Sequence, residues 1–218
     1  LSKGMTYKAS AAGLNLGGGK AVIIGDPKKH KSEALFRAFG AYINSLQGRY
    51  ITAEDVGTTV NDMEYLFMET PFVTGIPVSL GGSGDPSPYT AHGTLMGIKA
   101  AVKFKLGTDS LSGVRIAVQG LGSVGSNLLD YLIKEKAIVT IADIDPEKVK
   151  RMSEKYNVTA VDADQIVTSE CDVLAPCALG AVINDKTINK LRCKIIAGGA
   201  NNQLAEQKHG DALMELGI

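Results

Sequence analysis

A glycine-rich turn at residues 120–125 contains the first groups that could do chemistry. Its sequence, Gly-Leu-Gly-Ser-Val-Gly, matches the G-x-G-x-x-G pattern. In that pattern Gly120 permits a tight bend, Gly122 lets backbone amides approach a pyrophosphate, and Gly125 lets the next helix pack closely. The N-terminus of that helix offers free N–H groups and a positive dipole end to phosphates. Asp143 follows about twenty residues later, where a carboxylate binds the ribose of NAD. The turn therefore favours a dinucleotide site over an ordinary glycine bend.

Lys20, which follows three consecutive glycines, is a second candidate. The stretch is not the loop of a nucleoside triphosphatase, because Ala21 and an apolar run replace the expected Ser or Thr and helix. Glycines leave room for a ligand to approach the lysine closely. A lysine can act as a base when burial and a neighbouring cation lower its pKa, and Lys8 is the candidate cation. A flexible loop with a solvated lysine is the alternative for this segment alone.

The pattern of apolar residues predicts the elements that position these groups. In the first half we expect a strand at 21–24, a helix at 31–46, a strand at 50–53 that ends at Asp55, and a helix at 61–69. A loop at 80–87, rich in glycine, serine and proline, precedes a long helix at 89–105. We take that helix as the connection between two domains.

The second half alternates strands with helices, which is typical of a parallel sheet with right-handed crossovers. Ligands of such sheets bind at the carboxyl ends of the strands, so the turns after Ala175 and Ala197 are expected to line one crevice. We predict a Rossmann-type doubly wound sheet in an α/β protein. Its strands are expected at 114–119, 138–142, 159–161, 172–175 and 194–197, and its helices after 122, at 146–156 with Asp145 as the cap, at 163–169 and from Leu204.

Composition excludes several classes of partner. Lys plus Arg and Asp plus Glu number 23 each in the 218 residues, so nothing indicates binding to nucleic acid or to an anionic membrane. No apolar run has the length of a membrane span and no signal peptide is present, so we expect a cytoplasmic protein with reduced cysteines. We expect no metal site. His30 and His209 are interpreted as surface residues, and His92 as a packed or partly exposed one.

Several stretches of the chain resemble the Glu/Leu/Phe/Val dehydrogenase family, and together they cover nearly its whole length. In the first half they are residues 4–8, 14–20, 51–59 and 85–88, and in the second half 120–125, 175–180 and 200–204. The paired lysine motifs are the most specific of them. The resemblance implies oxidative deamination of an amino acid to its 2-oxo acid and ammonium, with hydride passing to NAD.

The resemblance also implies roles for individual residues. Lys8 would hold the substrate carboxylate, Lys20 would be the catalytic base, and Asp55 would orient the amino group and tune Lys20. Thr90 and the pair Asn201–Asn202 would contact the nicotinamide end of the cofactor. The other cofactor-binding residues would be Gly120, Leu121, Gly122, Ser123, Val124, Gly125, Ser126, Asp143, Cys177 and Ala178.

Two choices remain within this interpretation. Asp143 and Asp145 would repel a 2′-phosphate, which favours NAD over NADP. Ala53 and Thr74 would leave less room and less apolar surface for a ring, which favours L-leucine and other branched-chain amino acids; phenylalanine is the alternative. A non-catalytic NAD-binding module is the alternative from another class, although it would need neither lysine.

The resemblance has departures, of which length is the largest. Relatives carry further segments at both ends, so we expect a truncated chain that neither binds NAD well nor turns over by itself, and a homo-oligomer when full length. Asp85 stands where asparagine is more common and Gly125 where many relatives have alanine. We divide the chain into a partial substrate domain at 1–88, a connection at 89–112 and an NAD-binding Rossmann domain at 113–218.

Overall fold

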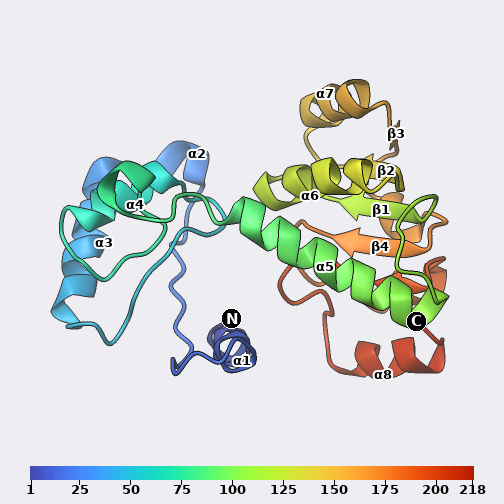
Figure 1. Ribbon diagram of the computed structural model, residues 1–218. Helices are drawn as coiled ribbons and strands as arrows, with labels where there is room; N and C mark the ends of the chain where they lie inside the picture. Colours follow the sequence, from blue (N-terminus) through green and yellow to red (C-terminus); the bar gives the residue numbers. More distant parts are fainter. The chain divides into compact units, whose positions relative to one another are not determined.

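The computed structural model describes residues 1–218. The chain forms two compact units, residues 1–86 and residues 87–218, each with its own core (Figure 1). No helix is long and apolar enough to cross a membrane.

The first unit is built mainly from helices. Its core lies between α3 and α4, where Phe36, Ile43, Met63 and Leu66 are buried. Each of these helices begins at a side-chain cap: Ser32 accepts the amide of Leu35, and Thr59 forms a reciprocal capping box with Asp62. The helices are α1 (Ser2–Ala11), α2 (Pro27–His30), α3 (Glu33–Ser45), α4 (Val60–Phe67) and the 3-10 helix η1 (Val78–Leu80).

Two strands expected in this unit are not formed as predicted. Residues 21–24 are extended but pair with no strand, and the side chains of Val22 and Ile24 are 71% and 98% exposed. The stretch 50–53 contributes a single parallel bridge, between Thr52 and Val73. The prediction was wrong because β-branched composition favours an extended backbone, whereas a strand also requires a neighbour to accept its hydrogen bonds.

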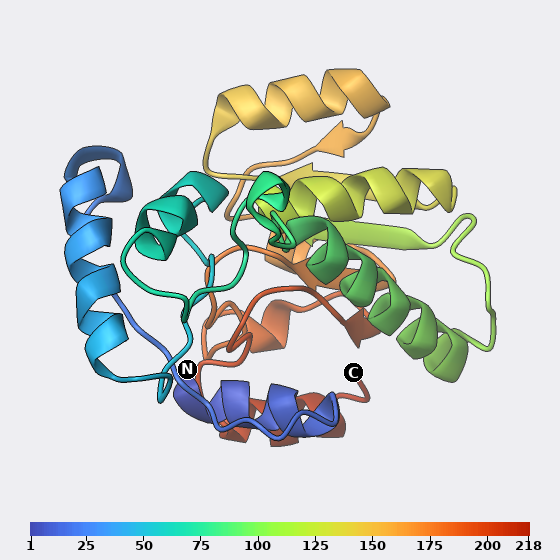
Figure 2. The same ribbon diagram turned by 60° about the vertical axis from the view of Figure 1, so that its left-hand side comes forward.

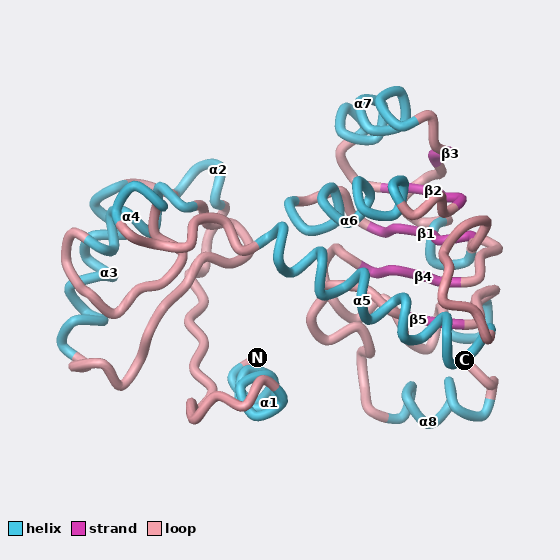
Figure 3. The backbone as a smooth tube through the Cα atoms, viewed as in Figure 1, coloured by secondary structure: helices cyan, strands magenta, loops and turns pink.

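The second unit contains the predicted parallel sheet. Its five strands lie in the order β3-β2-β1-β4-β5, as the magenta segments of Figure 3 show. The central strand β1 pairs Ile116 with Val139 of β2 on one side and with Val173 of β4 on the other. The strands are β1 (Arg115–Gln119), β2 (Ile138–Ala142), β3 (Thr159–Ala160), β4 (Val173–Pro176) and β5 (Ile195–Ile196).

Helices cover both faces of this sheet, which makes it doubly wound. The helices α5 and α6, side by side in Figure 2, bury Ile98 and Leu128 against one face. The other face buries Leu174 and Ile183 beneath η2, η3 and α8. The helical elements are α5 (Ser87–Leu106), α6 (Ser123–Lys134), α7 (Pro146–Tyr156), η2 (Ile166–Thr168), η3 (Ile188–Lys190) and α8 (Lys208–Glu215).

Most predicted boundaries in this unit agree with the structure. Helix α7 begins after Asp145, whose carboxylate accepts the amides of Glu147 and Lys148. The last helix begins at Lys208, later than the predicted Leu204, because Leu204 makes a parallel bridge with Ile183. The segment 163–169 contains a short 3-10 helix instead of an α-helix.

Candidate functional site

The glycine turn between β1 and α6 has the geometry that each of its glycines predicts. Gly120 has a φ of +94°, and a Cβ there would lie 2.9 Å from the backbone nitrogen of Ala178. A Cβ at Gly125 would lie 1.9 Å from the carbonyl oxygen of Gly120, so α6 packs directly on the turn. A Cβ at Gly122 would have nothing within 4 Å. The backbone at Gly122 is therefore open for a ligand to approach.

Asp143 follows β2 and is hydrogen-bonded to the glycine turn. Its Oδ2 accepts the amide of Leu121 at 2.5 Å, and its Oδ1 accepts the amide of Asp145 at 2.9 Å. Ile144, between the two acids, is 92% exposed. The carboxylate is thus fixed next to the turn, where it still has lone pairs to accept a ribose hydroxyl.

Two further turns, after β4 and after β5, pack on each other at the same end of the sheet. The amide of Ala200 donates to the carbonyl of Pro176 at 2.8 Å, and the amide of Ala181 donates to the carbonyl of Asn202 at 2.7 Å. Ala181 and Asn202 both have a positive φ, 64° and 47°, which is uncommon for residues other than glycine. The predicted crevice residues Cys177, Ala178, Asn201 and Asn202 belong to these turns.

Residues that were not predicted support the same turns. Gln203 donates its amide nitrogen to the carbonyl of Gly198 at 2.7 Å. A Cβ at Gly199 would lie 2.9 Å from Val124, 3.3 Å from the hydroxyl of Thr94 and 3.9 Å from Cys177. Thr94 in turn donates to the carbonyl of the predicted cofactor residue Thr90 at 2.9 Å. No sequence pattern marks Gln203 or Thr94, because their roles depend on contacts between distant parts of the chain.

In the first unit, Lys20 and Asp55 form an ion pair although 35 residues separate them. The side chain of Lys20 is 23% exposed and that of Asp55 is 40% exposed. The other carboxylate oxygen of Asp55 accepts the amide of Val56 at 2.7 Å. The hydroxyl of Thr58 accepts the amide of Asp55 at 2.9 Å and is 2.8 Å from its carbonyl. The turn 55–58 therefore holds this carboxylate in place.

Burial lowers the pKa of Lys20, and the positive charge of Lys8 lowers it further. The carboxylate of Asp55 acts in the opposite direction, because it stabilises the ammonium form. Lys8 lies on α1, so its charge acts on Lys20 from a different element of the same unit. A lowered pKa is the property that a lysine needs to serve as a base near neutral pH.

The glycines before Lys20 have a packing role that differs from the expected one. A Cβ at Gly18 would lie 1.9 Å from the carbonyl oxygen of Ser2, and one at Gly19 would lie 2.6 Å from the ring of Tyr50. Gly18 and Gly19 thus let α1 and an aromatic ring approach the backbone next to Lys20. Gly17 has nothing within 4 Å of a Cβ, so it remains open.

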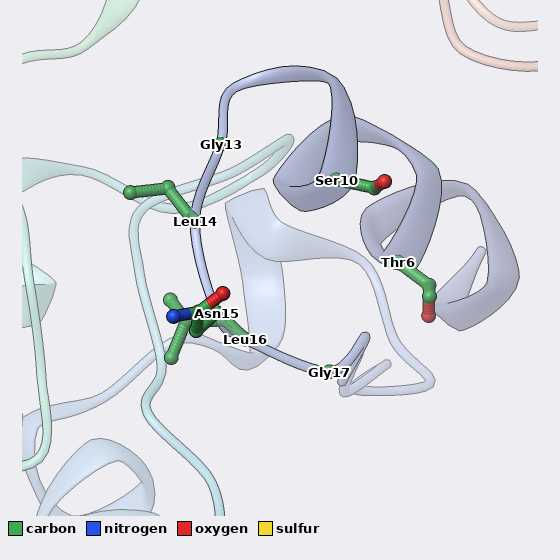
Figure 4. A pocket seen from close by; sticks show the side chains of 7 residues that line it. All are labelled: Thr6, Ser10, Gly13, Leu14, Asn15, Leu16 and Gly17. Carbon is green, nitrogen blue, oxygen red and sulfur yellow. The ribbon is translucent and has the colours of Figure 1, made fainter.

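Each of the predicted substrate-wall residues, Ala53 and Thr74, directly follows one partner of the Thr52–Val73 bridge. Thr74 donates its amide to the carbonyl of Thr52 at 2.9 Å, and Ala53 is the next residue along. Both Ala53 and Thr74 are exposed. A separate hollow of about 440 Å³ lies beside α1 and is lined by Thr6, Ser10 and residues 13–17 (Figure 4). It does not include Lys8, Lys20 or Asp55.

The interpretation of His209 as a surface residue was wrong. His209 is 2% exposed, and its Nε2 lies 3.1 Å from Asp185. Its ring, Asp185 and Glu206 are close enough to hold a metal ion. However, Lys208 is 3.2 Å from both carboxylates, so the two acids already have a cation of the protein as a shared partner. The cluster therefore joins α8 to the preceding turn as a structural contact.

Comparisons with known proteins agree with this geometry. The dimerisation domain of the Glu/Leu/Phe/Val dehydrogenases matches residues 1–72, and the Glutamate/Leucine/Phenylalanine/Valine dehydrogenase domain matches residues 81–147 and 145–215. Leucine dehydrogenase of Bacillus subtilis (strain 168) is 58% identical over the whole chain, and phenylalanine dehydrogenase of Caldalkalibacillus thermarum (strain TA2.A1) is 48% identical. The chain spans 60% of the length of each of these curated relatives.

A solved structure is similar over the same extent. The crystal structure of L-tryptophan dehydrogenase from Nostoc punctiforme matches all of this chain and 62% of its own, with 41% identity and a TM-score of 0.77. The two domain matches together cover most of the 218 residues, and they meet near the boundary between the two compact units. The chain belongs to the Glu/Leu/Phe/Val dehydrogenase family.

Proposed function

We propose that the protein containing this chain oxidatively deaminates L-leucine and other branched-chain amino acids to 2-oxo acids and ammonium, with NAD as the hydride acceptor. The observation that carries the proposal is the Lys20–Asp55 ion pair, in which burial and Lys8 lower the pKa of the lysine. A module that only binds NAD needs no such lysine. The amino-acid dehydrogenase relatives support the same reaction class.

The residues of the first unit supply the proton chemistry. Lys8 binds the substrate carboxylate as an ammonium ion. When bound, NAD would supply the acceptor for the hydride of the substrate Cα, and loss of that hydride would convert the substrate amine to an iminium. Lys20, as the free amine, accepts a proton from the water that adds to this carbon. Asp55 accepts a hydrogen bond from the amino group and stabilises the protonated form of Lys20. Lys20 then returns its proton to the nitrogen, which leaves as ammonia and takes up the hydroxyl proton of the adduct, giving ammonium and the 2-oxo acid.

The residues of the second unit fit a dinucleotide. The open backbone at Gly122 and the N-terminus of α6 suit a pyrophosphate, and residues 120–126 would hold it. Asp143 would accept hydrogen bonds from the ribose. Thr90, Asn201 and Asn202, with Cys177 and Ala178, would surround the nicotinamide end. The carboxylates of Asp143 and Asp145 support NAD over NADP, because a 2′-phosphate bound beside them would meet like charge.

The preference for branched-chain substrates rests on Ala53 and Thr74. A methyl group and a hydroxyl at the substrate wall leave less space and less apolar surface for a phenyl ring. A difference of one methylene is worth about 1–3 kcal/mol, so the preference should be graded. The identity to leucine dehydrogenases, 55–58%, against 47–48% for phenylalanine dehydrogenases, supports the same order.

We also propose a cytoplasmic homo-oligomer. The three cysteines are free thiols, which suits a reducing compartment. The name of the domain that matches residues 1–72, a dimerisation domain, supports self-association.

The test is the rate of NAD reduction by the full natural polypeptide that contains this chain, with leucine, valine, isoleucine and phenylalanine as substrates. We expect the highest kcat/KM with leucine, and a relative gain for phenylalanine in the variant Ala53→Gly. A preference for phenylalanine in the unmodified protein would overturn the substrate assignment but leave the reaction class intact. NAD binding without turnover of any amino acid would favour a non-catalytic module.

A further inference from the structure

A second lysine–aspartate ion pair, Lys31 with Asp62, lies near the candidate catalytic pair in the chain. It is much less exposed than an ordinary surface pair: the side chain of Asp62 is 7% exposed and that of Lys31 is 26% exposed. The neighbouring pair Lys29–Asp26, at 3.5 Å, has exposures of 76% and 40%. Removing two charges from water costs free energy, and loss of one partner of such a pair strongly destabilises the folded protein, because the other charge is left buried without a partner.

Both pairs join the same two stretches of the chain. Lys20 and Lys31 lie in the segment between α1 and α3, whereas Asp55 and Asp62 lie in the segment that forms a turn and then α4. A hydrogen-bonded backbone connects the two aspartates: Thr58 holds Asp55, and Thr59 donates to Asp62 at 2.8 Å from its amide and 2.9 Å from its hydroxyl. Displacing Asp62 would therefore displace the turn that carries Asp55.

Glu54 increases the dependence of this region on Lys31. One of its carboxylate oxygens is buried without a hydrogen-bond partner. Burial raises the pKa of Glu54, and the carboxylates of Asp85 and Asp62 raise it further, whereas the charge of Lys31 lowers it. Lys31 thus compensates two acids, Asp62 directly and Glu54 through space. Without this cation, the residue next to Asp55 would lose a charge that stabilises its ionised form.

We propose that Lys31 is a positioning residue for the reaction: through Asp62 and the capped turn before it, Lys31 holds Asp55 against Lys20. The proposal rests on the proposed function, since it assigns Lys20 and Asp55 to the catalytic pair. Lys31 would thus contribute to the reaction although no contact of this residue with substrate or cofactor is expected. The sequence alone does not distinguish Lys31 from Lys28 and Lys29, which lie beside it on the surface.

The test compares three variants of the full natural polypeptide with the unmodified protein. Lys31→Met removes the cation, Lys31→Arg keeps it, and the double variant Lys31→Met with Asp62→Asn removes both charges while the amide oxygen still caps α4. Lys29→Met is the matched control, because it breaks the exposed pair at the short helix α2, which ends immediately before Lys31. We measure kcat and KM for leucine per folded molecule, and the pH dependence of kcat/KM.

We expect Lys31→Met and the double variant to lower kcat/KM about 10-fold to 100-fold, since small misplacements of catalytic groups have effects of that size. The acidic limb of kcat/KM should move to lower pH, because Lys20 loses the counter-charge of Asp55. Lys31→Arg and Lys29→Met should remain within about twofold of the unmodified protein.

The proposal is overturned if activity per folded molecule and the pH limb of the double variant match those of the unmodified protein. It is also overturned if loss of folded protein accounts for the whole loss of activity in Lys31→Met, or if Lys29→Met loses as much. An unmodified protein without amino-acid dehydrogenase activity would instead contradict the proposed function.

Discussion

The amide of Leu121 donates a hydrogen bond of 2.5 Å to the carboxylate of Asp143, which links the glycine turn after β1 to the acid after β2. The same carboxylate accepts the amide of Asp145, so Asp143 holds two segments of the backbone in addition to its proposed role in binding the ribose. Replacing Asp143 should therefore have two separable effects, one on the shape of the turn and one on cofactor choice.

We predict that Asp143→Ser weakens the binding of NAD and reduces the discrimination against NADP. Loss of the hydrogen bond to Leu121 should impair both cofactors, whereas loss of the negative charge should help only NADP. The measurement is therefore the ratio of kcat/KM for NAD to that for NADP. Asp145→Ser, in which serine still caps α7, measures the share of the second carboxylate in the same ratio, and we expect a smaller change there than in Asp143→Ser. An unchanged ratio in Asp143→Ser would show that another group selects the cofactor.

Lys20 and Lys8 should respond differently to substitution. Lys20→Ala should lower kcat by about 10²–10⁴-fold, the usual contribution of a general base. Lys8→Ala should act mainly on KM for the amino acid, with partial rescue by analogues that need no carboxylate contact. Lys3→Ala, on the same helix as Lys8, is the control. Near-normal turnover by Lys20→Ala would require the two roles to be reassigned.

The lowered pKa of Lys20 gives a direction for the pH dependence. Below that pKa the side chain is an ammonium ion and cannot accept a proton, so kcat/KM should rise as the pH increases through it. Because Lys8 contributes to the lowering, Lys8→Met should move this limb to higher pH. A limb that stays in place would mean that burial alone sets the pKa of Lys20.

Two alanine substitutions in the glycine turn should separate folding from cofactor binding. Gly120→Ala places a Cβ at a φ of +94° and 2.9 Å from the backbone of Ala178, so it should destabilise the protein by about 1–2 kcal/mol or more. Gly122→Ala meets no atom within 4 Å and should leave Tm unchanged. Gly122→Ala should nevertheless weaken the binding of NAD, because the added methyl group obstructs the approach of the pyrophosphate. Equal loss of Tm in both variants would contradict this division.

Asp172 should stabilise the second unit in a pH-dependent manner. The Arg115 side chain donates hydrogen bonds to Asp172 and lowers its pKa to about 2, from an ordinary value of 3.8. The folded state thus holds the proton less tightly than the unfolded state. The resulting stabilisation, at most about 2 kcal/mol, is present above pH 4 and is lost as the pH falls towards 2.

Denaturation of Asp172→Asn checks this prediction. The variant should unfold at lower denaturant concentration than the unmodified chain at pH 7, and the difference should shrink in acid. Glu170→Gln is the control: Glu170 also contacts Arg115, at 2.8 Å, but its side chain is 64% exposed. Exposed pairs contribute little to stability, so this control should change the midpoint only slightly. Equal effects of both substitutions would contradict the assignment to Asp172.

The sequence predicted the second unit well because its signals are local. The glycine turn, the cap at Asp145 and the alternating apolar runs each specify a few neighbouring residues, and β2 and α7 have the predicted bounds. The stretch 21–24 could not be settled in this way, since an extended segment becomes a strand only when another strand lies beside it. His209 was misjudged for a related reason: its partner Asp185 is 24 residues away.

The residues of the candidate site also fall into two groups, those that local sequence motifs predicted and those that only the folded structure brings together. The family motifs identified Lys8, Lys20 and Asp55, and the charges of Lys20 and Asp55 meet in the structure. The supporting contacts were not predicted. Lys31 and Asp62 resemble solvated surface charges in the sequence, and only the fold shows that their side chains are largely buried together.

Backbone hydrogen bonds join the turns after β1, β4 and β5 to one another and to the strand ends: Ala200 donates to Pro176, Ala181 donates to Asn202, and Cys177 donates to Gln119. The chain therefore loses the conformational entropy of these turns when it folds, and little remains to be lost on binding. A preorganised site gains affinity in this way without any additional contact. In calorimetry, cofactor binding to this unit should show a small heat-capacity change, without the large value that accompanies the ordering of a loop.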